Sequence, residues 1–334
     1  MGNVLIAQKL SSILKEEKSK PKKLKLFGNI WREGELCVLI GEAGTGKTIL
    51  GMQIGLSIAD PEKIRHYDYN IVNDSLEVTT EPQKVLYMNF EMDNSQIAER
   101  YKGEDGTVFE PPHDFIVLAM NSDDATLEDY KNEIIDNLNK YESKVLIIDN
   151  LSSFVAFGLK VEENDSVVKF MAWLKNVKKE YGLSILLIHH PTKRRKHSEL
   201  SLNDISGSSA IGRFIDSAFG IGKNVRFSGN ARYMVQIKSR SSQALFHSEN
   251  TAMFNIHRNH NRLLCSFTGD TMPEYQCLKF SDNQIDDRDE QIRERYRNGE
   301  TKSQLHREYN KSVTHISRIV KPIDDEKRES DAPF

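Results

Sequence analysis

The stretch Gly41-Glu42-Ala43-Gly44-Thr45-Gly46-Lys47-Thr48 fits the phosphate-binding loop pattern G-x-x-x-x-G-K-[ST] at every required position. The aliphatic run Leu36 to Ile40 before it predicts a buried parallel strand, and residues 48–59 after it carry apolar side chains at helical spacing. In this order of strand, loop and helix, the glycines allow backbone N–H groups to surround a phosphate at the helix N-terminus. The stretch, continued by Ile49, therefore predicts the binding site of a nucleoside triphosphate.

Side chains for phosphate and metal binding are also present. Lys47 can reach the β- and γ-phosphate oxygens, and the Thr48 hydroxyl can bind Mg²⁺. Farther along, Val145-Leu146-Ile147-Ile148 is an aliphatic strand that ends in Asp149, the Walker B pattern, whose carboxylate holds Mg²⁺ through its water shell. The predicted cofactors are therefore ATP and Mg²⁺, with Thr48 and Asp149 as the metal residues.

Two other predicted strands end in polar side chains. Val85 to Phe90 is followed by Glu91, and Leu183 to Ile188 by His189-His190. Ligands bind beyond the carboxyl ends of parallel strands, so Glu91 would face the nucleotide and activate water if its strand neighbours the P-loop strand. A helix cap or a surface acid would suit the same position. A histidine here can sense a γ-phosphate, or it can be hydrogen-bonded at the sheet edge.

Length and composition limit the class of protein. The chain has 334 residues and a net charge of -3, so we expect one large domain with an appendage and only local surfaces for nucleic acid. The three cysteines are scattered, which argues against a disulfide framework or a zinc site. The sequence contains neither a signal peptide nor a long apolar run, so we expect a cytoplasmic protein without a membrane partner.

The order of the predicted elements indicates an α/β fold with a mostly parallel central sheet. A strand at 115–119 and helices at 127–141 and 161–181 continue the alternation. From Phe219 the pattern changes to strands without long helices, at 233–237, 253–256 and 263–267, which predicts an antiparallel extension. We therefore divide the chain into an N-terminal helix and linker (1–33), an ATPase domain (34–282), a helical module (283–322) and a disordered tail (323–334). Residues 60–82 are expected to form a loop-rich insertion.

Two groups of cations are candidates for phosphate contacts. The basic run at 191–198 suits DNA phosphates through Lys193, Arg194, Arg195 and Lys196, although a solvated loop explains it too. Lys238 and Arg240 follow a predicted strand. In an oligomer they could reach the γ-phosphate of a neighbouring subunit as an arginine finger, or they could be a surface pair.

The C-terminal module has three short predicted helices, at 292–297, 301–309 and 313–320, joined by tight turns. This arrangement is typical of a helix-turn-helix. The last helix carries Thr314, His315 and Arg318 without an acid among them, which suits a DNA groove. A helical cap that docks another protein is the alternative.

These motifs, in this order, resemble the RecA-like ATPases, and most of all the plasmid-encoded RepA-type hexameric replicative helicases, over about Leu26 to Phe280. The resemblance includes the segment Gly207 to Ile211. It implies a ring of subunits with ATP at each interface. It also implies that Glu91 is the catalytic carboxylate, that His190 is the γ-phosphate sensor, and that Lys238 and Arg240 form the Lys-x-Arg finger. The insertion and the helix-turn-helix have no counterpart in that family.

The resulting hypothesis is a ring-forming, DNA-dependent ATPase with the hexamer as the favoured ring. It would act as a helicase-type motor on single-stranded DNA in the replication of a plasmid, phage or other mobile element. The alternative is an ATP-switched DNA-binding regulator, initiator or loader without unwinding activity, whose helix-turn-helix contacts duplex DNA. An ATPase acting on a protein or a small molecule is a third class.

Overall fold

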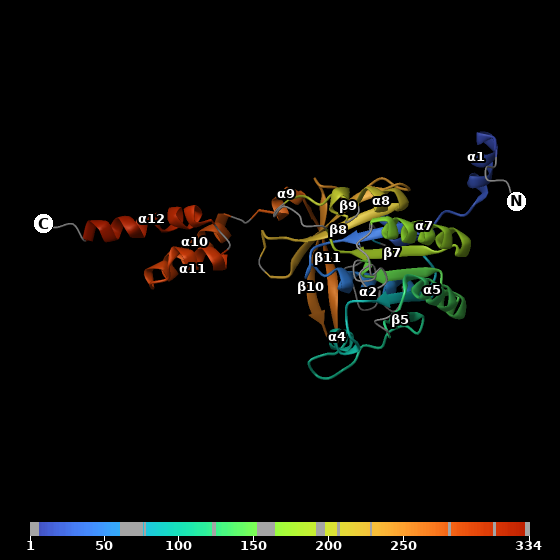
Figure 1. Ribbon diagram of the computed structural model, residues 1–334, viewed down its shortest axis with the longest axis horizontal. Coiled ribbons are helices and arrows are strands. Elements are labelled where there is room, and N and C mark those ends of the chain that lie inside the picture. The colour runs from blue at the N-terminus through green and yellow to red at the C-terminus, as the bar shows by residue number, and fades with distance from the viewer. Residues whose placement is uncertain are drawn as a thin grey trace.

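A nine-stranded sheet forms the centre of the molecule (Figure 1). The computed structural model describes residues 7–60, 76, 78–121, 125–151, 164–191, 198–205, 208–227, 229–279, 282–309 and 312–330. The sheet order is β11-β10-β9-β8-β3-β7-β6-β4-β5. The strands are β3 (Leu36–Ile40), β4 (Val85–Asn89), β5 (Phe115–Ala119), β6 (Val145–Asp149), β7 (Ser184–His189), β8 (Ser217–Lys223), β9 (Ala231–Ser239), β10 (Thr251–Asn259) and β11 (Arg262–Met272).

The strands from β8 to β5 run parallel, and β9, β10 and β11 continue the sheet with antiparallel pairing. The predicted fold class, α/β with a mostly parallel sheet and an antiparallel extension, is therefore confirmed. The strand β8 was not predicted, because Gly220 and Gly222 interrupt its apolar pattern. Gly222 is needed there, since a Cβ atom at this position would lie 2.4 Å from the ring of Tyr233.

The strand order differs from the one under which Glu91 was expected to face the nucleotide. The strand that precedes Glu91, β4, does not neighbour the P-loop strand β3, because β7 and β6 lie between them. Each of these strands is completely buried, and a run of buried aliphatic residues does not state which strands lie beside it.

Helices cover both faces of the sheet. Side chains of a strand alternate between its faces, so Leu36, Val38 and Ile40 join one core and Cys37 and Leu39 the other. The first core is closed by α5 (Leu127–Tyr141), α7 (Asn164–Tyr181) and α8 (Ser208–Phe214). The second is closed by α2 (Lys47–Ala59) and by the short pair β1 (Lys25–Phe27) and β2 (Trp31–Arg32).

The residues just before the P-loop strand belong to this second core. Leu26, Phe27, Ile30 and Trp31 are at most 3% exposed. Residues 25–33, which we expected in the N-terminal linker, are thus packed against the sheet, because four large apolar side chains in six residues are stabilised by burial there. Before them, every residue of α1 (Leu10–Ser19) is exposed.

Three helices follow the sheet and form a core of their own, apart from the main body in Figure 1. They are α10 (Asp282–Arg297), α11 (Lys302–Tyr309) and α12 (Val313–Ser330). Both α10 and α12 are longer than the helices predicted at 292–297 and 313–320, and the first part of the expected disordered tail is helical. Among the side chains of α10 that the structure describes, Ile292 alone belongs to the fully buried cluster, and the charged residues Arg288, Asp289 and Glu290 before it show no apolar spacing.

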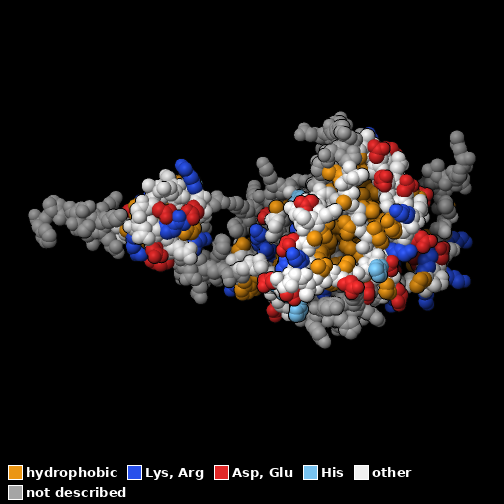
Figure 2. Space-filling view, turned by 90° about the horizontal axis from the view of Figure 1, so that it is seen from below, with side chains coloured by type: hydrophobic (Ala, Val, Ile, Leu, Met, Phe, Trp, Pro, Cys, Tyr) orange, Lys and Arg blue, Asp and Glu red, His pale blue; other side chains and the backbone are white. Residues whose placement is uncertain are grey.

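The strand β5 is an open edge of the sheet. Val117 at its centre is 37% exposed, and its neighbours Ile116 and Leu118 are partly exposed. Figure 2 shows hydrophobic side chains gathered on the underside of the body, where β5 lies in Figure 1.

No helix in the described part of the chain is long and apolar enough to span a bilayer.

Candidate active site at the P-loop

The loop between β3 and α2 has the backbone that a phosphate-binding loop needs. Gly44 and Gly46 have φ angles of +70° and +99°, a region that side chains other than glycine rarely adopt. Gly46 is also in close contact with the sheet extension, since a Cβ atom there would lie 2.3 Å from Cδ1 of Ile256 on β10. The loop and the first turn of α2 line a cavity through Gly44, Gly46 and Lys47, and the first N–H groups of a helix have no partner within the helix.

A chain of contacts connects the P-loop lysine to the predicted catalytic carboxylate. Lys47 Nζ lies 3.0 Å from the carbonyl oxygen of Glu42 and 3.2 Å from Nδ1 of His190. An ammonium group has only donors, so Nδ1 accepts and the proton of a neutral ring is on Nε2. This Nε2 lies 3.7 Å from Oε1 of Glu91, and Asn150 Nδ2 donates to Oε2 of Glu91 at 2.9 Å. Lys47, His190 and Glu91 are therefore brought together as predicted, although their strands are not all neighbours.

Local turns explain how Glu91 reaches the site. The backbone N–H groups of Glu91 and Met92 donate to Oδ1 of Asn89, at 3.3 Å and 3.0 Å, so the chain turns as soon as β4 ends. The following helix, α4 (Asn94–Arg100), is capped by Asp93, whose side chain accepts from Gln96 N at 2.8 Å. The N-cap of this helix is thus Asp93 and not Glu91. The side chain of Glu91 instead lies next to His190.

The protonation of the site follows from these contacts. Hydrogen bonding by His190 lowers the pKa of Glu91 to about 2, with Asn150 and Lys47 adding to this effect and burial opposing it. Burial lowers the pKa of Lys47, against the raising effect of Glu91 and Asp149. Burial likewise lowers the pKa of His189 to about 4. Glu91 is therefore a carboxylate at neutral pH, the form that can accept a proton from water.

The predicted metal residues fit Mg²⁺. Asp149 is fully buried at the end of β6, and its Oδ2 accepts a hydrogen bond from the hydroxyl of Tyr87 at 2.6 Å. Its other oxygen, Oδ1, has no hydrogen-bond partner among the described residues. Burial raises the pKa of Asp149, while the nearby hydroxyls of Tyr87 and Thr48 lower it. A buried carboxylate oxygen without a partner, close to the Thr48 hydroxyl, is the arrangement that a hydrated cation would complete.

Two arginines that the sequence patterns did not indicate face the same space. A cavity of about 230 Å³ is lined by the P-loop, Glu91 and His190, and also by Arg100, Arg232 and Ile256. Arg232 is only 8% exposed, its Nη1 donates to the carbonyl of Ala231, and its Nε has no partner among the described residues. Nη1 of Arg100 is buried and equally unpaired within that part of the chain. Arg232 was missed because the sheet order that brings the start of β9 to the P-loop cannot be read from local patterns, and Arg100, the last residue of α4, belongs to no motif.

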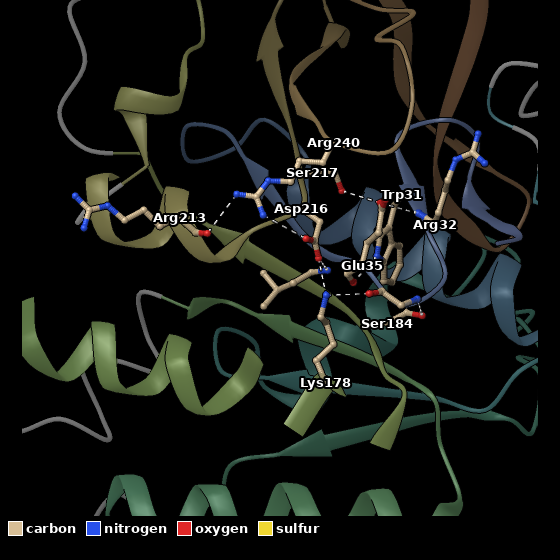
Figure 3. A network of polar contacts seen from close by, with 11 residues as sticks. Trp31, Arg32, Glu35, Lys178, Ser184, Arg213, Asp216, Ser217 and Arg240 are labelled. Atoms are coloured by element: carbon tan, nitrogen blue, oxygen red, sulfur yellow. Dashed lines mark hydrogen bonds and ion pairs between the residues drawn. The ribbon is translucent and has the colours of Figure 1, made fainter. Parts of the chain in front are cut away.

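Lys238 and Arg240 lie far from this cavity. Because β9 runs antiparallel to β8, its last residues pair with Ser217 and Ala218 at the start of β8. They therefore lie at the amino-terminal ends of the parallel strands, whereas the P-loop follows the carboxyl end of β3. Figure 3 shows Arg240 directed to Asp216, with Nη1 at 3.6 Å from Oδ1 and Nη2 at 3.4 Å from the carbonyl of Arg213. Lys238 Nζ donates to the carbonyl of Gly212 at 2.7 Å. Within one chain, the pair cannot contact the nucleotide of its own P-loop.

The predicted DNA residues are only partly visible. Lys193, Arg194, Arg195 and Lys196 lie outside the described residues. Thr314, His315 and Arg318 are exposed on α12, whose buried face includes Ile316, Ile319 and Val320.

Comparison with known proteins shows the family and the fold of the chain. A family model described as an AAA domain matches residues 7–196, more than half of the chain. The chain belongs to this AAA domain family. Its structure is similar to that of a KaiC-like protein from the hyperthermophilic archaeon Pyrococcus horikoshii, with a TM-score of 0.50, 14% identity, and coverage of 74% of this chain and 99% of that one. No curated protein matches. The family and the fold together support a RecA-like P-loop ATPase.

Proposed function

We propose that this AAA domain protein hydrolyses ATP as a DNA-dependent motor. In this proposal identical subunits form a ring, with six as the expected number, which translocates on single-stranded DNA and unwinds duplex in the replication of a plasmid, phage or other mobile element. The observation that carries the proposal is the line of contacts from Lys47 through His190 to Glu91, because it combines a phosphate-binding cation, a polar sensor and a carboxylate base in one cavity.

The residues have separate tasks in hydrolysis. Glu91 accepts a proton from the attacking water, and Asn150 keeps its carboxylate oriented through the 2.9 Å hydrogen bond. Lys47 neutralises negative charge that develops on the transferred phosphoryl group, and Mg²⁺ held by Thr48 and Asp149 supplies further positive charge when bound. His190 contacts both Lys47 and Glu91, one at each ring nitrogen. Loss of the γ-phosphate that Lys47 binds would therefore change the contacts of His190.

Assembly is supported by what one subunit lacks. In the described part of the chain, the cavity of about 230 Å³ is smaller than the ~300–1,000 Å³ of typical ligand sites, which leaves room for a second surface to enclose the nucleotide. Lys238 and Arg240, at the opposite edge, are available to a neighbouring subunit as the finger pair. The open, apolar edge of β5 is a further surface that a neighbour would bury.

DNA is the proposed partner on the evidence of the C-terminal helices. Thr314, His315 and Arg318 form an exposed polar face on a helix whose other face is buried, as expected for the second helix of a helix-turn-helix. The same face favours the second candidate function, a DNA-bound regulator or loader in which ATP switches assembly without unwinding. A motor and a regulator both need the P-loop site, so the site alone does not distinguish them.

Unwinding distinguishes the two functions. We expect ATP hydrolysis by the full chain to rise when single-stranded DNA is added, and a forked duplex with a labelled strand to open in the presence of ATP and Mg²⁺. The variant Glu91→Gln should bind DNA and fail to open the fork. Tight binding to duplex DNA with neither stimulation nor opening would replace the motor with the regulator, and ATP hydrolysis that is indifferent to all DNA would favour a protein or small-molecule substrate.

A further inference from the structure

Tyr87 is buried beside the proposed metal site without being part of any known motif in the sequence. Its side chain is fully buried on β4, and its hydroxyl donates to Oδ2 of Asp149 at 2.6 Å. The distance is that of a strong, charge-assisted hydrogen bond. The carboxylate of Asp149 is therefore held by one oxygen, while Oδ1 lacks a partner among the described residues.

The sheet explains why the two groups meet. Tyr87 pairs with Ile147 across β4 and β6, and Asn89 pairs with Asp149, so Tyr87 and Asp149 are diagonal neighbours on one face of the sheet. A tyrosine is long enough to bridge such a diagonal. That face is the one covered by α2, and a Cβ atom at Gly51, one turn after Thr48, would lie 3.9 Å from the Tyr87 hydroxyl. The hydroxyl thus lies between the start of α2 and the end of β6.

Packing alone does not account for the hydroxyl. The ring of Tyr87 contacts that of Phe115, with centroids 5.6 Å apart, and belongs to the core that includes Ile147 and Ile188. A phenylalanine would make these contacts equally well. A buried hydroxyl instead needs a partner, and here that partner is the one carboxylate expected to orient the hydrated cation.

We propose that Tyr87 is a positioning residue for metal binding: its hydroxyl holds Oδ2 of Asp149 so that Oδ1 is directed to the water shell of Mg²⁺. The role rests on the proposed function, in which Asp149 binds the metal. Groups that orient a metal-binding side chain typically change metal affinity by about 10–100-fold when they are removed. Because Asp149 acts through water, we expect an effect near the lower end of that range.

The test is the affinity for Mn²⁺, a spectroscopic substitute for Mg²⁺, measured by electron paramagnetic resonance with the full chain and a non-hydrolysable ATP analogue. We expect Tyr87→Phe to weaken Mn²⁺ binding about tenfold and to leave binding of the analogue in EDTA unchanged. The matched control is Tyr233→Phe, which removes a second buried hydroxyl that donates to a carboxylate, Oε1 of Glu274, at 3.0 Å. The control should bind Mn²⁺ as the wild type does.

A double-mutant cycle separates the possible failures. If Tyr87 acts through Asp149, adding Tyr87→Phe to Asp149→Asn should cause no further loss of Mn²⁺ affinity. Equal Mn²⁺ affinity in Tyr87→Phe and wild type, while Asp149→Asn is weakened, would overturn the positioning role alone. Unchanged affinity in Asp149→Asn would overturn the metal assignment in the proposed function, and the role of Tyr87 with it. Thermal unfolding of each variant identifies any loss that comes from misfolding.

Discussion

Glu91 shows how two neighbouring side chains can position one carboxylate. It follows a strand that is separated from the P-loop strand, and it reaches the site because His190 and Asn150, at the ends of the two intervening strands, both contact its carboxylate. The low pKa of Glu91, about 2, follows first from His190. The carboxylate is therefore present throughout the range in which the protein would work.

Replacing this carboxylate tests its role directly. In Glu91→Gln we expect kcat for ATP hydrolysis to fall by about 10²–10⁴-fold, the usual contribution of a general base. Nucleotide affinity should stay within about twofold, because the amide keeps the size and one acceptor of the carboxylate. Phosphate release and equilibrium binding measure the two quantities. The exposed Glu99→Gln on α4 is the control, and undiminished turnover in Glu91→Gln would remove Glu91 from the mechanism.

Replacing Arg232 is expected to change ATP affinity and protein stability in opposite directions. A buried guanidinium without a counter-ion destabilises the free protein and stabilises a complex with an anion. We therefore expect Arg232→Met to weaken ATP binding about tenfold or more, the size of a lost hydrogen bond to a charged group, while the unfolding temperature without nucleotide stays equal or rises. The exposed Arg226→Met should change neither quantity. Lower stability with unchanged affinity would contradict this assignment.

The site residues that belong to sequence motifs could be predicted, whereas those that reach the site only through the order of the strands could not. Lys47, Thr48 and Asp149 are tied to a local pattern, and the structure brings them together. Arg232 and Tyr87 carry no such pattern, since each contacts the site from a strand whose neighbours are decided by long-range packing. Metal binding and catalysis by the motif residues remain predictions for experiment.

Among the elements, α2 lies so close to the sheet that glycine is required in its interior. A Cβ atom at Gly51 would lie 2.4 Å from Cδ1 of Ile188 on β7. We expect Gly51→Ala to lower the free energy of unfolding by about 1–3 kcal/mol, the cost of overpacking a core. The control is Gly212→Ala on α8, where no described atom lies within 4 Å of the new Cβ. It should be neutral or stabilising by up to ~1 kcal/mol. Urea unfolding measures both, and equal effects would contradict the close packing of α2.

The elements also show what periodicity can and cannot predict. The five aliphatic strands from β3 to β7 were predicted within a residue or two at each end, because each is a short, fully or mostly apolar run. The glycine-containing β8 was not predicted, and the predicted helix at 292–297 covers only the last part of α10. In both cases the element forms because its neighbours bind it, β8 between β3 and β9 and α10 against α12.

For the whole molecule, a site shared between subunits can be tested by mixing. Arg240→Ala and Glu91→Gln should each be inactive as pure proteins. A mixed oligomer contains some interfaces in which an intact Glu91 meets an intact Arg240, so we expect ATPase activity to return when the two are combined. A mixture of Glu91→Gln with Lys47→Ala, both damaged on the P-loop side, is the control and should stay inactive. No recovery in the first mixture would mean that Arg240 does not act across an interface.

The C-terminal helices offer a second test at this scale. Arg318→Ala should weaken binding to duplex DNA about tenfold, within the ~1–3 kcal/mol expected for a base contact. Arg307 is also exposed, on α11, and Arg307→Ala is the control. Fluorescence anisotropy at two salt concentrations measures both variants. Equal binding by Arg318→Ala and wild type would favour the protein-docking cap over the helix-turn-helix.

The opposite positions of the P-loop and of Arg240 on one sheet have a consequence for symmetry. A contact between the P-loop side of one subunit and the Arg240 side of the next is head-to-tail, and a two-fold dimer cannot satisfy it. Copies joined in this way leave one unmatched end at each side until the rotation closes, and a rotation that does not close gives a helical filament. Every such assembly has a direction, and all its members point the same way around or along the axis. A directed array of identical sites is what a protein needs in order to follow a strand of DNA from one end to the other.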